Sequence, residues 1–163
     1  MIKLKNILLA VVGLAIALFS PTVINFIDIL SPINFLMIYV FLICLYSSSN
    51  DIFLIASSMA FGFVYDVLLG RYEGYYMLNF FLISIILTYL KNKLLKEKVS
   101  AMFFICFLMI LLNALLNSIV ISLPNISKML SSDMVASNLT FIIENSIATL
   151  VIITIMTKTT KQR

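Results

Sequence analysis

The chain has 163 residues, of which 63% are hydrophobic and only 11% are charged, and its formal net charge is +4. A soluble domain has roughly 45–50% apolar and about 25% charged residues, so this chain has too little polar surface to cover its own core. The mean hydropathy of +1.15 points the same way. The composition therefore excludes an ordinary soluble protein and predicts an integral membrane protein, with residues 1–163 forming a single domain.

The chain contains no histidine, and its two cysteines, Cys44 and Cys106, each stand inside an apolar run. Histidine-ligated zinc sites and Ser-His-Asp chemistry are therefore excluded. The cysteines lack the spacing of a metal site, so we interpret them as small buried hydrophobic residues and leave a disulfide open. We expect no metal, no cofactor, no catalytic residues and no nucleic-acid partner.

Charges, prolines and polar clusters divide the chain into six apolar segments, each a predicted membrane span. A helix needs about 20 mostly apolar residues to cross the hydrocarbon. In chain order, the predicted spans cover about 7–27, 32–47, 51–70, 74–90, 99–123 and 135–157. The second has a short apolar core, Phe35 to Tyr46, and it crosses fully only if Pro32 begins the helix. The predicted fold class is therefore all-α, a polytopic membrane protein with six transmembrane helices.

The first span has a second interpretation, as a cleaved signal peptide. Lys3 and Lys5 would supply its basic start, and Ala15-Ile16-Ala17 would supply a small-residue cleavage site. The apolar run, however, continues almost unbroken to Ile27, beyond the about 7–15 residues of a signal peptide. We expect this span to be retained, and its cleavage would leave the remaining topology unchanged.

The positions of lysine and arginine predict the orientation, because short loops rich in these residues stay in the cytoplasm. Nine of the eleven basic residues form three groups: Lys3 and Lys5; Lys91, Lys93, Lys96 and Lys98; and Lys158, Lys161 and Arg163. Four spans separate the first group from the second, and two separate the second from the third. All nine then lie on one side, with Arg71 and Lys128 on the other. We therefore predict that both termini are cytoplasmic.

The basic segment at 91–98 follows the fourth span and has two candidate partners on the cytoplasmic side. One is anionic lipid, because each cation near the inner leaflet contributes about 1 kcal/mol. The other is a cytoplasmic filament. We favour lipid.

Six polar side chains inside the predicted spans form a predicted cluster in the outer half of the membrane. They are Asp66, Asn79, Asn113, Asn117, Glu144 and Asn145. An ionisable group at mid-membrane costs about 2.5–3.5 kcal/mol, so Asp66 and Glu144 should face the bundle interior, where asparagines donate hydrogen bonds to them. One interpretation, which we favour, is a structural polar network. The other is a cavity, open to the outer face, that binds a small molecule.

A stripe of small residues runs along the third span. Gly62, Asp66, Gly70 and Gly74 follow one another at intervals of four. The first three share one helix face, drifting by about 40° per step, and small residues on such a face let a neighbouring helix approach closely. Gly70 and Gly74 also bracket the turn at 71–73. The stripe predicts a tight hairpin of the third and fourth spans, with Asp66 and Asn79 at similar depth on its two arms.

This hairpin resembles a known family. The run Gly62-xxx-Asp66-xxx-Gly70-xxx-Gly74, followed by Leu78-Asn79 and an apolar helix that ends in a basic loop, resembles MreD, the small polytopic membrane component of the bacterial rod-shape machinery. Chain length, the six-span layout and the region from Pro32 to Asp51 also fit. The motif covers residues 62–79 closely, and the rest of the chain matches in layout only. Arg71-Tyr72-Glu73 stands where the family often has a proline.

The resemblance implies a non-enzymatic scaffold in the bacterial cytoplasmic (inner) membrane. It implies a place in the cell-elongation complex that supports peptidoglycan synthesis, with MreC as the main partner. Further implied partners are the actin-like filament MreB, the RodA glycosyltransferase and its transpeptidase partner. Self-association is left open.

The resemblance also implies a fold similar to the substrate-binding S components of energy-coupling-factor (ECF) transporters. The alternative function is therefore a substrate-binding membrane subunit of a small-molecule transporter, in which Asp66, Asn79, Asn117 and Glu144 converge on a solute. We favour the scaffold. An enzyme is the least expected class, because two isolated carboxylates without a nucleophile motif do not make an acid/base pair.

Overall fold

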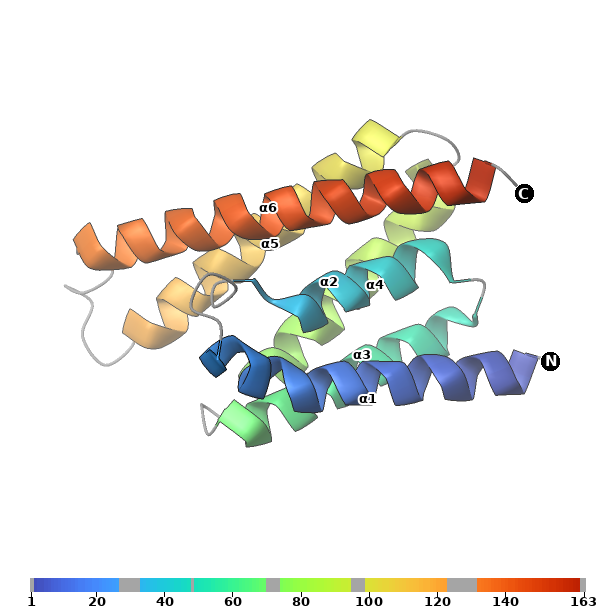
Figure 1. The fold of residues 1–163 in the computed structure, drawn as a ribbon, viewed down its shortest axis with the longest axis horizontal. Helices are drawn as coiled ribbons and strands as arrows, with labels where there is room; N and C mark the ends of the chain where they lie inside the picture. The colour runs from blue at the N-terminus through green and yellow to red at the C-terminus, as the bar shows by residue number, and fades with distance from the viewer. Residues whose placement is uncertain are drawn as a thin grey trace. The chain divides into compact units, whose positions relative to one another are not determined.

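The computed structural model describes residues 2–26, 33–47, 49–69, 74–94, 99–122 and 132–161. These residues form six α-helices and contain no strand, as Figure 1 shows. In chain order, the helices are α1 (Ile2–Phe26), α2 (Phe35–Tyr46), α3 (Asp51–Leu69), α4 (Tyr75–Leu94), α5 (Val99–Ser122) and α6 (Ser132–Lys161). The prediction of an all-α fold is confirmed for the described residues, and each predicted span overlaps one helix.

Three of the described helical segments are long and apolar enough to cross a membrane: Asp51–Leu69, Ser100–Ile119 and Ser132–Lys158. Shorter apolar segments, Leu4–Ser20, Phe35–Tyr46 and Tyr75–Lys91, lie in the other three helices. Because a helix rises about 1.5 Å per residue, a segment of about 20 residues matches the hydrocarbon thickness. The structure therefore fits a membrane protein with several apolar helices, and the count of six crossings stays a prediction.

The second helix begins later than the sequence predicts. α2 starts at Phe35, and the side chain of Asn34 accepts a hydrogen bond from the Met37 N–H at 2.9 Å. Asparagine is a favoured capping residue because its oxygen satisfies a free N–H of the first turn. A start at Pro32, the condition for a full crossing, is therefore not met by α2, and Pro32 itself lies outside the described residues. With 12 residues, α2 is roughly 18 Å long, shorter than the hydrocarbon is thick.

The fourth helix ends later than predicted. α4 continues to Leu94, so Lys91 and Lys93 belong to the helix and not to a loop at 91–98. Lysine and leucine are good helix formers, so nothing in this stretch stops the helix at residue 90. The predicted basic loop is shortened by four residues at its start.

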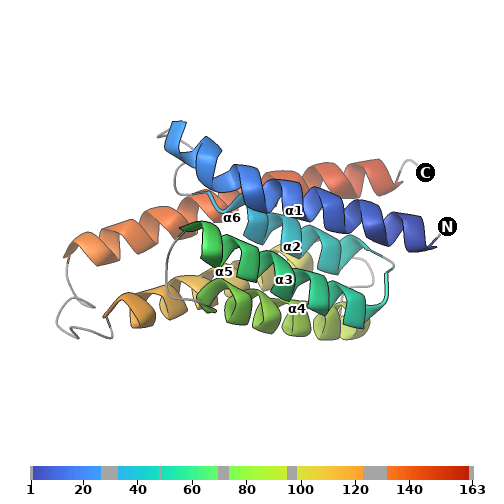
Figure 2. The same cartoon turned by 90° about the horizontal axis from the view of Figure 1, so that it is seen from below.

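Residues Met1–Glu97 form a first compact unit, which contains α1 to α4. The most extensive helix contact in this unit joins α3 to α4, which lie side by side in Figures 1 and 2. α2 contacts the other three helices, and its fully or almost fully buried side chains include Leu36, Val40 and Phe41. A helix that is apolar on all sides is usually buried. The short α2 therefore fills the centre of this unit.

Residues Lys98–Arg163 form the second compact unit, in which α5 packs against α6. A hydrogen bond joins the two helices: the Asn138 Nδ2 donates to the Ser118 Oγ at 2.7 Å. The Ser118 hydroxyl in turn donates to the Ala114 carbonyl at 2.8 Å. Such polar contacts hold membrane helices together where apolar packing alone gives little preference over lipid. Whether residues 1–163 form one domain stays a prediction.

Candidate functional site

The candidate site is the start of α4, where the carboxylate of Asp66 reaches across from α3. One carboxylate oxygen accepts a hydrogen bond from the Tyr76 N–H at 2.9 Å, and the other accepts one from the Met77 N–H at 3.0 Å. The first N–H groups of a helix have no partner within it. Asp66 therefore satisfies the second and third residues of α4 from a different helix.

This position also explains how a carboxylate that is only 1% exposed is stabilised in such an apolar chain. A helix N-terminus carries the equivalent of roughly half a positive charge, which favours an anion beside it. Hydrogen bonds to a carboxylate are shorter and stronger than neutral ones. The partial positive charge at the start of α4 thus stabilises the carboxylate of Asp66, which lipid could not do.

Gly62, one turn before Asp66, is the place where the main chains of α3 and α4 meet. A β-carbon at position 62 would lie 2.6 Å from the carbonyl carbon of Tyr76 and 2.7 Å from the α-carbon of Met77. Real β-carbons essentially never come closer than 3.0 Å to another heavy atom. Any other residue at this position would push α4 away from α3, and with it the two N–H groups that Asp66 binds.

Gly74 immediately precedes α4 and has a φ angle of +93°, a conformation that other residues rarely adopt. Its carbonyl accepts the Leu78 N–H at 2.9 Å, which starts the hydrogen bonding of the helix. A β-carbon here would meet nothing within 4 Å. Glycine is therefore favoured at position 74 for its backbone conformation and not for lack of space. At the N-cap position a side-chain oxygen usually binds the second or third N–H. Gly74 has no side chain, and Asp66 takes over this task.

Aromatic rings surround the capping hydrogen bonds. The Tyr76 ring packs edge-on against Tyr65 and against Tyr75, each at a centroid distance of 4.8 Å, and lies 5.8 Å from Phe80. Tyr65 and Tyr76 are almost fully buried. Water exclusion of this kind lowers the local dielectric constant and strengthens a satisfied hydrogen bond. The rings therefore add to the stability of the hairpin.

Asp66 has two donors that the sequence does not predict. Asn79 lies on α4 and is 1% exposed, and the main-chain amides of Tyr76 and Met77 both donate to Asp66. These amides are free at the start of a helix and need no side-chain ordering. The structure thus adds two main-chain donors to Asp66, and donation by asparagine side chains stays a prediction.

The predicted cluster of six polar residues divides between the two units. Asp66 and Asn79 belong to the first, whereas Asn113, Asn117, Glu144 and Asn145 belong to the second. Asn113 and Asn145 are buried, and the Asn145 amide donates to the Phe141 carbonyl of its own helix at 2.8 Å. Within the described part of the chain, one Glu144 carboxylate oxygen is buried without a hydrogen-bond partner. The convergence of all six residues stays a prediction.

The remaining residues of the predicted glycine stripe and basic loop are only partly described. Gly70 and the turn at 71–73 lie outside the described residues, as do Lys96 and Lys98. Lys93 is helical, but its side chain is not described. Cys44 and Cys106 are both buried and not disulfide-bonded, in agreement with their interpretation as small hydrophobic residues.

A second polar network, which the sequence alone does not predict, ties together three helix ends. The Lys91 ammonium on α4 donates to the Ser47 carbonyl, just after the last residue of α2. The Ser47 hydroxyl donates to the Ser49 hydroxyl at 2.8 Å, which donates to the Asn6 side chain of α1 at 2.7 Å. A cation is favourable at a helix C-terminus. Lys91 therefore contributes to packing inside its unit.

The geometry at the start of α4 indicates a structural role for Asp66. Both carboxylate oxygens already accept hydrogen bonds from α4, so the group is engaged in holding the hairpin together. The sequence signal for this role is the four-residue spacing of Gly62, Asp66, Gly70 and Gly74. No protein-family model, curated protein or solved structure matches this chain.

Proposed function

We propose that the protein is a non-enzymatic scaffold of a bacterial cell-elongation (rod-shape) complex, a multi-pass protein of the cytoplasmic membrane with six spans. One observation carries the proposal: Asp66 is bonded through both oxygens to the start of α4. Asp66 is also the one charged residue among the four spaced positions of the MreD-like motif. A carboxylate used in this way holds two helices together, which is the role expected of a scaffold.

The other described residues of the motif support the same proposal. Gly62 lets α3 and α4 touch, and Gly74 supplies the backbone conformation that starts α4. The described residues of the MreD-like run thus hold α3 and α4 together. Small residues and fixed helix pairs are the means by which membrane helices recognise one another. We propose MreC as the partner that packs on this hairpin, with MreB, RodA and its transpeptidase partner in the wider complex.

The proposed orientation, with both termini in the cytoplasm, gains support from the network around Ser47. This network joins Asn6 near the start of α1, Ser47 after the end of α2 and Lys91 near the end of α4. These three helix ends therefore lie at one end of the first unit. Lys5 and Lys91 are then on the same side, as the distribution of basic residues requires.

The alternative, a solute-binding subunit of an ECF-type transporter, would use Asp66 together with Asn79, Asn117 and Glu144. The engagement of Asp66 with α4 weighs against this role. The Glu144 oxygen that lacks a partner among the described residues is the observation that favours it. Mass spectrometry of the denatured protein distinguishes the two functions, because a transporter subunit should carry a small molecule through purification.

The direct experiment is affinity purification of the full chain from its native membrane after mild cross-linking. The proposal predicts enrichment of MreC and of RodA. It predicts that Gly62→Leu, which forces α3 and α4 apart, abolishes this enrichment, whereas Met59→Leu, at a partly exposed position on the same helix, preserves it. Enrichment of a pair of ATPases in place of these partners would contradict the scaffold proposal.

A further inference from the structure

The helix α6 carries a carboxylate, Glu144, that lacks a hydrogen-bond donor within the described part of the chain. Its Oε2 atom is buried and accepts no hydrogen bond there. Two threonines of the same helix, Thr140 and Thr154, donate their hydroxyls to main-chain carbonyls one turn earlier, at 3.0 Å and 2.8 Å. An ionised carboxylate has only acceptors, so Glu144 cannot bond to its own helix in this way. Its donor has to come from elsewhere.

The neighbouring helix α5 packs on a different side of α6. That side is marked by Asn138, whose amide donates to α5 at 2.7 Å. The fully buried Asn145 lies on the same side, because it follows Asn138 by nearly two helical turns. Glu144 is turned by about 100° from Asn145. In the opposite direction from Asn145, its neighbours Ile147 and Val151 are 58% and 50% exposed. Glu144 therefore belongs to a face of α6 that α5 leaves uncovered.

The depth of Glu144 excludes lipid headgroups as its partner. The apolar segment Ser132–Lys158 is long enough to cross a membrane. Glu144 lies roughly 18 Å from one end of this segment and about 21 Å from the other. Since the hydrocarbon is about 30 Å thick, headgroups and bulk water lie out of reach of so short a side chain. Charged side chains at this depth pair with other polar groups inside the membrane, and a helical protein segment is what brings such a group there.

The sequence offers no basic side chain at the depth of Glu144. All eleven lysine and arginine residues lie near the termini, at 91–98, or at Arg71 and Lys128, which are at or beyond the ends of the predicted spans. A second copy of the chain does not supply the charge either. Two copies have the same orientation in the membrane, so they bring Glu144 next to Glu144, and like charges repel each other. The counter-charge therefore comes from a different protein.

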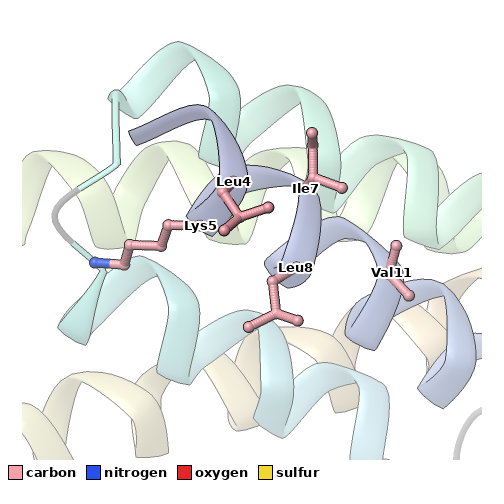
Figure 3. Close-up of a pocket in the computed structure, with 5 residues that line it drawn as sticks. All are labelled: Leu4, Lys5, Ile7, Leu8 and Val11. Atoms are coloured by element: carbon pink, nitrogen blue, oxygen red, sulfur yellow. The ribbon is translucent and has the colours of Figure 1, made fainter. Parts of the chain in front are cut away.

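The surface around Glu144 differs in this respect from the apolar hollow on α1. That hollow is lined by Leu4, Lys5, Ile7, Leu8 and Val11 (Figure 3). Its charged side chain, Lys5, already has an interaction partner in the structure. The α1 hollow thus lacks an unsatisfied charge that would select an occupant, whereas the α6 face has one.

We infer that the face of α6 formed by Glu144, Ile147 and Val151 packs against a transmembrane helix of another protein, and that this helix carries a lysine or arginine near the middle of its span. The two apolar side chains supply the packing surface. The ion pair with Glu144 supplies the selectivity, because a helix without the cation leaves the carboxylate unpaired. The inference rests on α6 crossing the membrane and does not depend on the scaffold function.

The test uses two synthetic helices of leucine and alanine, each about 20 residues long, with either a lysine or a leucine at the centre. Energy transfer between the labelled full chain and each labelled helix is measured in phosphatidylcholine vesicles. The wild type should bind the lysine helix several-fold more tightly than the leucine helix. Glu144→Gln should reduce this ratio to near unity, and Glu144→Asp should keep most of it. Asp133→Asn, which removes an exposed acid near the start of α6, should keep it fully.

A photo-reactive residue gives a second readout that leaves Glu144 unchanged. In place of Ile147 it should form adducts with the lysine helix. In place of Leu139, which is 54% exposed but turned by about 140° from Glu144, it should form few.

Four results would overturn the inference. The first is equal binding of both helices by the wild type, and the second is an equal loss of preference in Glu144→Gln and Asp133→Asn, which would show an effect of net charge. The third is equal adduct formation at positions 147 and 139. The fourth is adducts at 147 that join two copies of the chain in place of the lysine helix, which would assign this face to self-association.

Discussion

Gly62 of α3 lies so close to Met77 of α4 that a β-carbon on the glycine would stand 2.7 Å from the Met77 α-carbon. One turn further along α3, Asp66 accepts the Met77 N–H at 3.0 Å. The two contacts depend on each other, because the carboxylate reaches the start of α4 only while the two main chains touch. Gly62 allows the two helices to approach closely, and at this distance Asp66 can accept two hydrogen bonds from α4.

Gly62→Ala should destabilise the protein although alanine is the better helix former by about 1 kcal/mol. The added methyl group meets main-chain atoms of Tyr76 and Met77, which cannot move without moving α4. At Gly13, by contrast, the methyl group would meet the ring of Phe61, a side chain that can shift. Urea unfolding in detergent micelles should therefore show a larger decrease in the free energy of unfolding for Gly62→Ala than for Gly13→Ala. Equal losses would argue against main-chain contact at position 62.

Asp66→Ala should cost about 2–6 kcal/mol, because it leaves two N–H groups without an acceptor at about 1–3 kcal/mol each. Asp66→Asn should cost less, since its single oxygen still serves one of the two. Asp133→Asn, which removes the same charge from the exposed first turn of α6, is the matched control. Its effect should stay within about 1 kcal/mol, the contribution of an exposed acidic residue in the first turn of a helix. Equal unfolding free energies for all three variants would show that Asp66 contributes only through its charge.

Gly74→Ala should cost about 1–3 kcal/mol, because residue 74 has a positive φ angle. Gly74→Asn should cost less, since asparagine tolerates this region better than alanine does. The space around position 74 is open, so the size of the side chain should matter little. Thermal unfolding of the two variants, followed by circular dichroism, checks the order. A larger loss of thermal stability for Gly74→Asn than for Gly74→Ala would indicate that the side chain is crowded and that backbone strain is not the main cost.

Much of this fold could be predicted from the sequence, because apolar runs and charge positions determine where helices lie in a membrane protein. The four-residue spacing of Gly62 and Asp66 also predicted the close approach of the third and fourth spans. The partners of Asp66 could not be predicted, since main-chain N–H groups at a helix start are the same for every sequence. The start of α2 differs from the predicted start of the second span because Asn34 caps the helix through a hydrogen bond that spacing alone does not reveal.

The role of Lys91 was hidden for a different reason. Its partner, the Ser47 carbonyl, lies 44 residues away in the chain, and a main-chain carbonyl leaves no signature in the sequence. A basic residue that follows a span looks the same whether it faces lipid or caps another helix. Only the packing of α2 against α4 distinguishes the two cases.

Lys91→Met should loosen the last turn of α2, because the Ser47 carbonyl loses its charged donor. Hydrogen exchange in this turn should become several-fold faster, and Lys91→Arg should largely restore the slow exchange. Lys158→Met is the control, since it removes an exposed cation elsewhere in the chain. Faster exchange at the end of α2 in both methionine variants would point to net charge and not to the Ser47 contact.

Asn138→Ala should weaken the pairing of α5 with α6 by about 0.6 kcal/mol, the average for hydrogen bonds between membrane helices, and by no more than about 1.7 kcal/mol. The variant removes the donor to the Ser118 hydroxyl, whose own bond to Ala114 is unaffected. Thr140→Ala, at an exposed position on the same helix whose hydroxyl bonds within α6, should have a smaller effect. A double-mutant cycle with Ser118→Ala measures the coupling directly, and a coupling near zero would rule out the contact.

The most direct test of the hairpin is amide hydrogen exchange at Tyr76 and Met77 in lipid nanodiscs. Free N–H groups in the first turn of a helix exchange quickly, so capping by Asp66 predicts that these two amides are protected in the wild type. In Asp66→Ala their protection should fall at least about 10-fold, the effect of about 1.4 kcal/mol, while the amide of Ile83 in the middle of α4 keeps its protection. Unchanged exchange at Tyr76 and Met77 in Asp66→Ala would contradict the capping of α4 by Asp66.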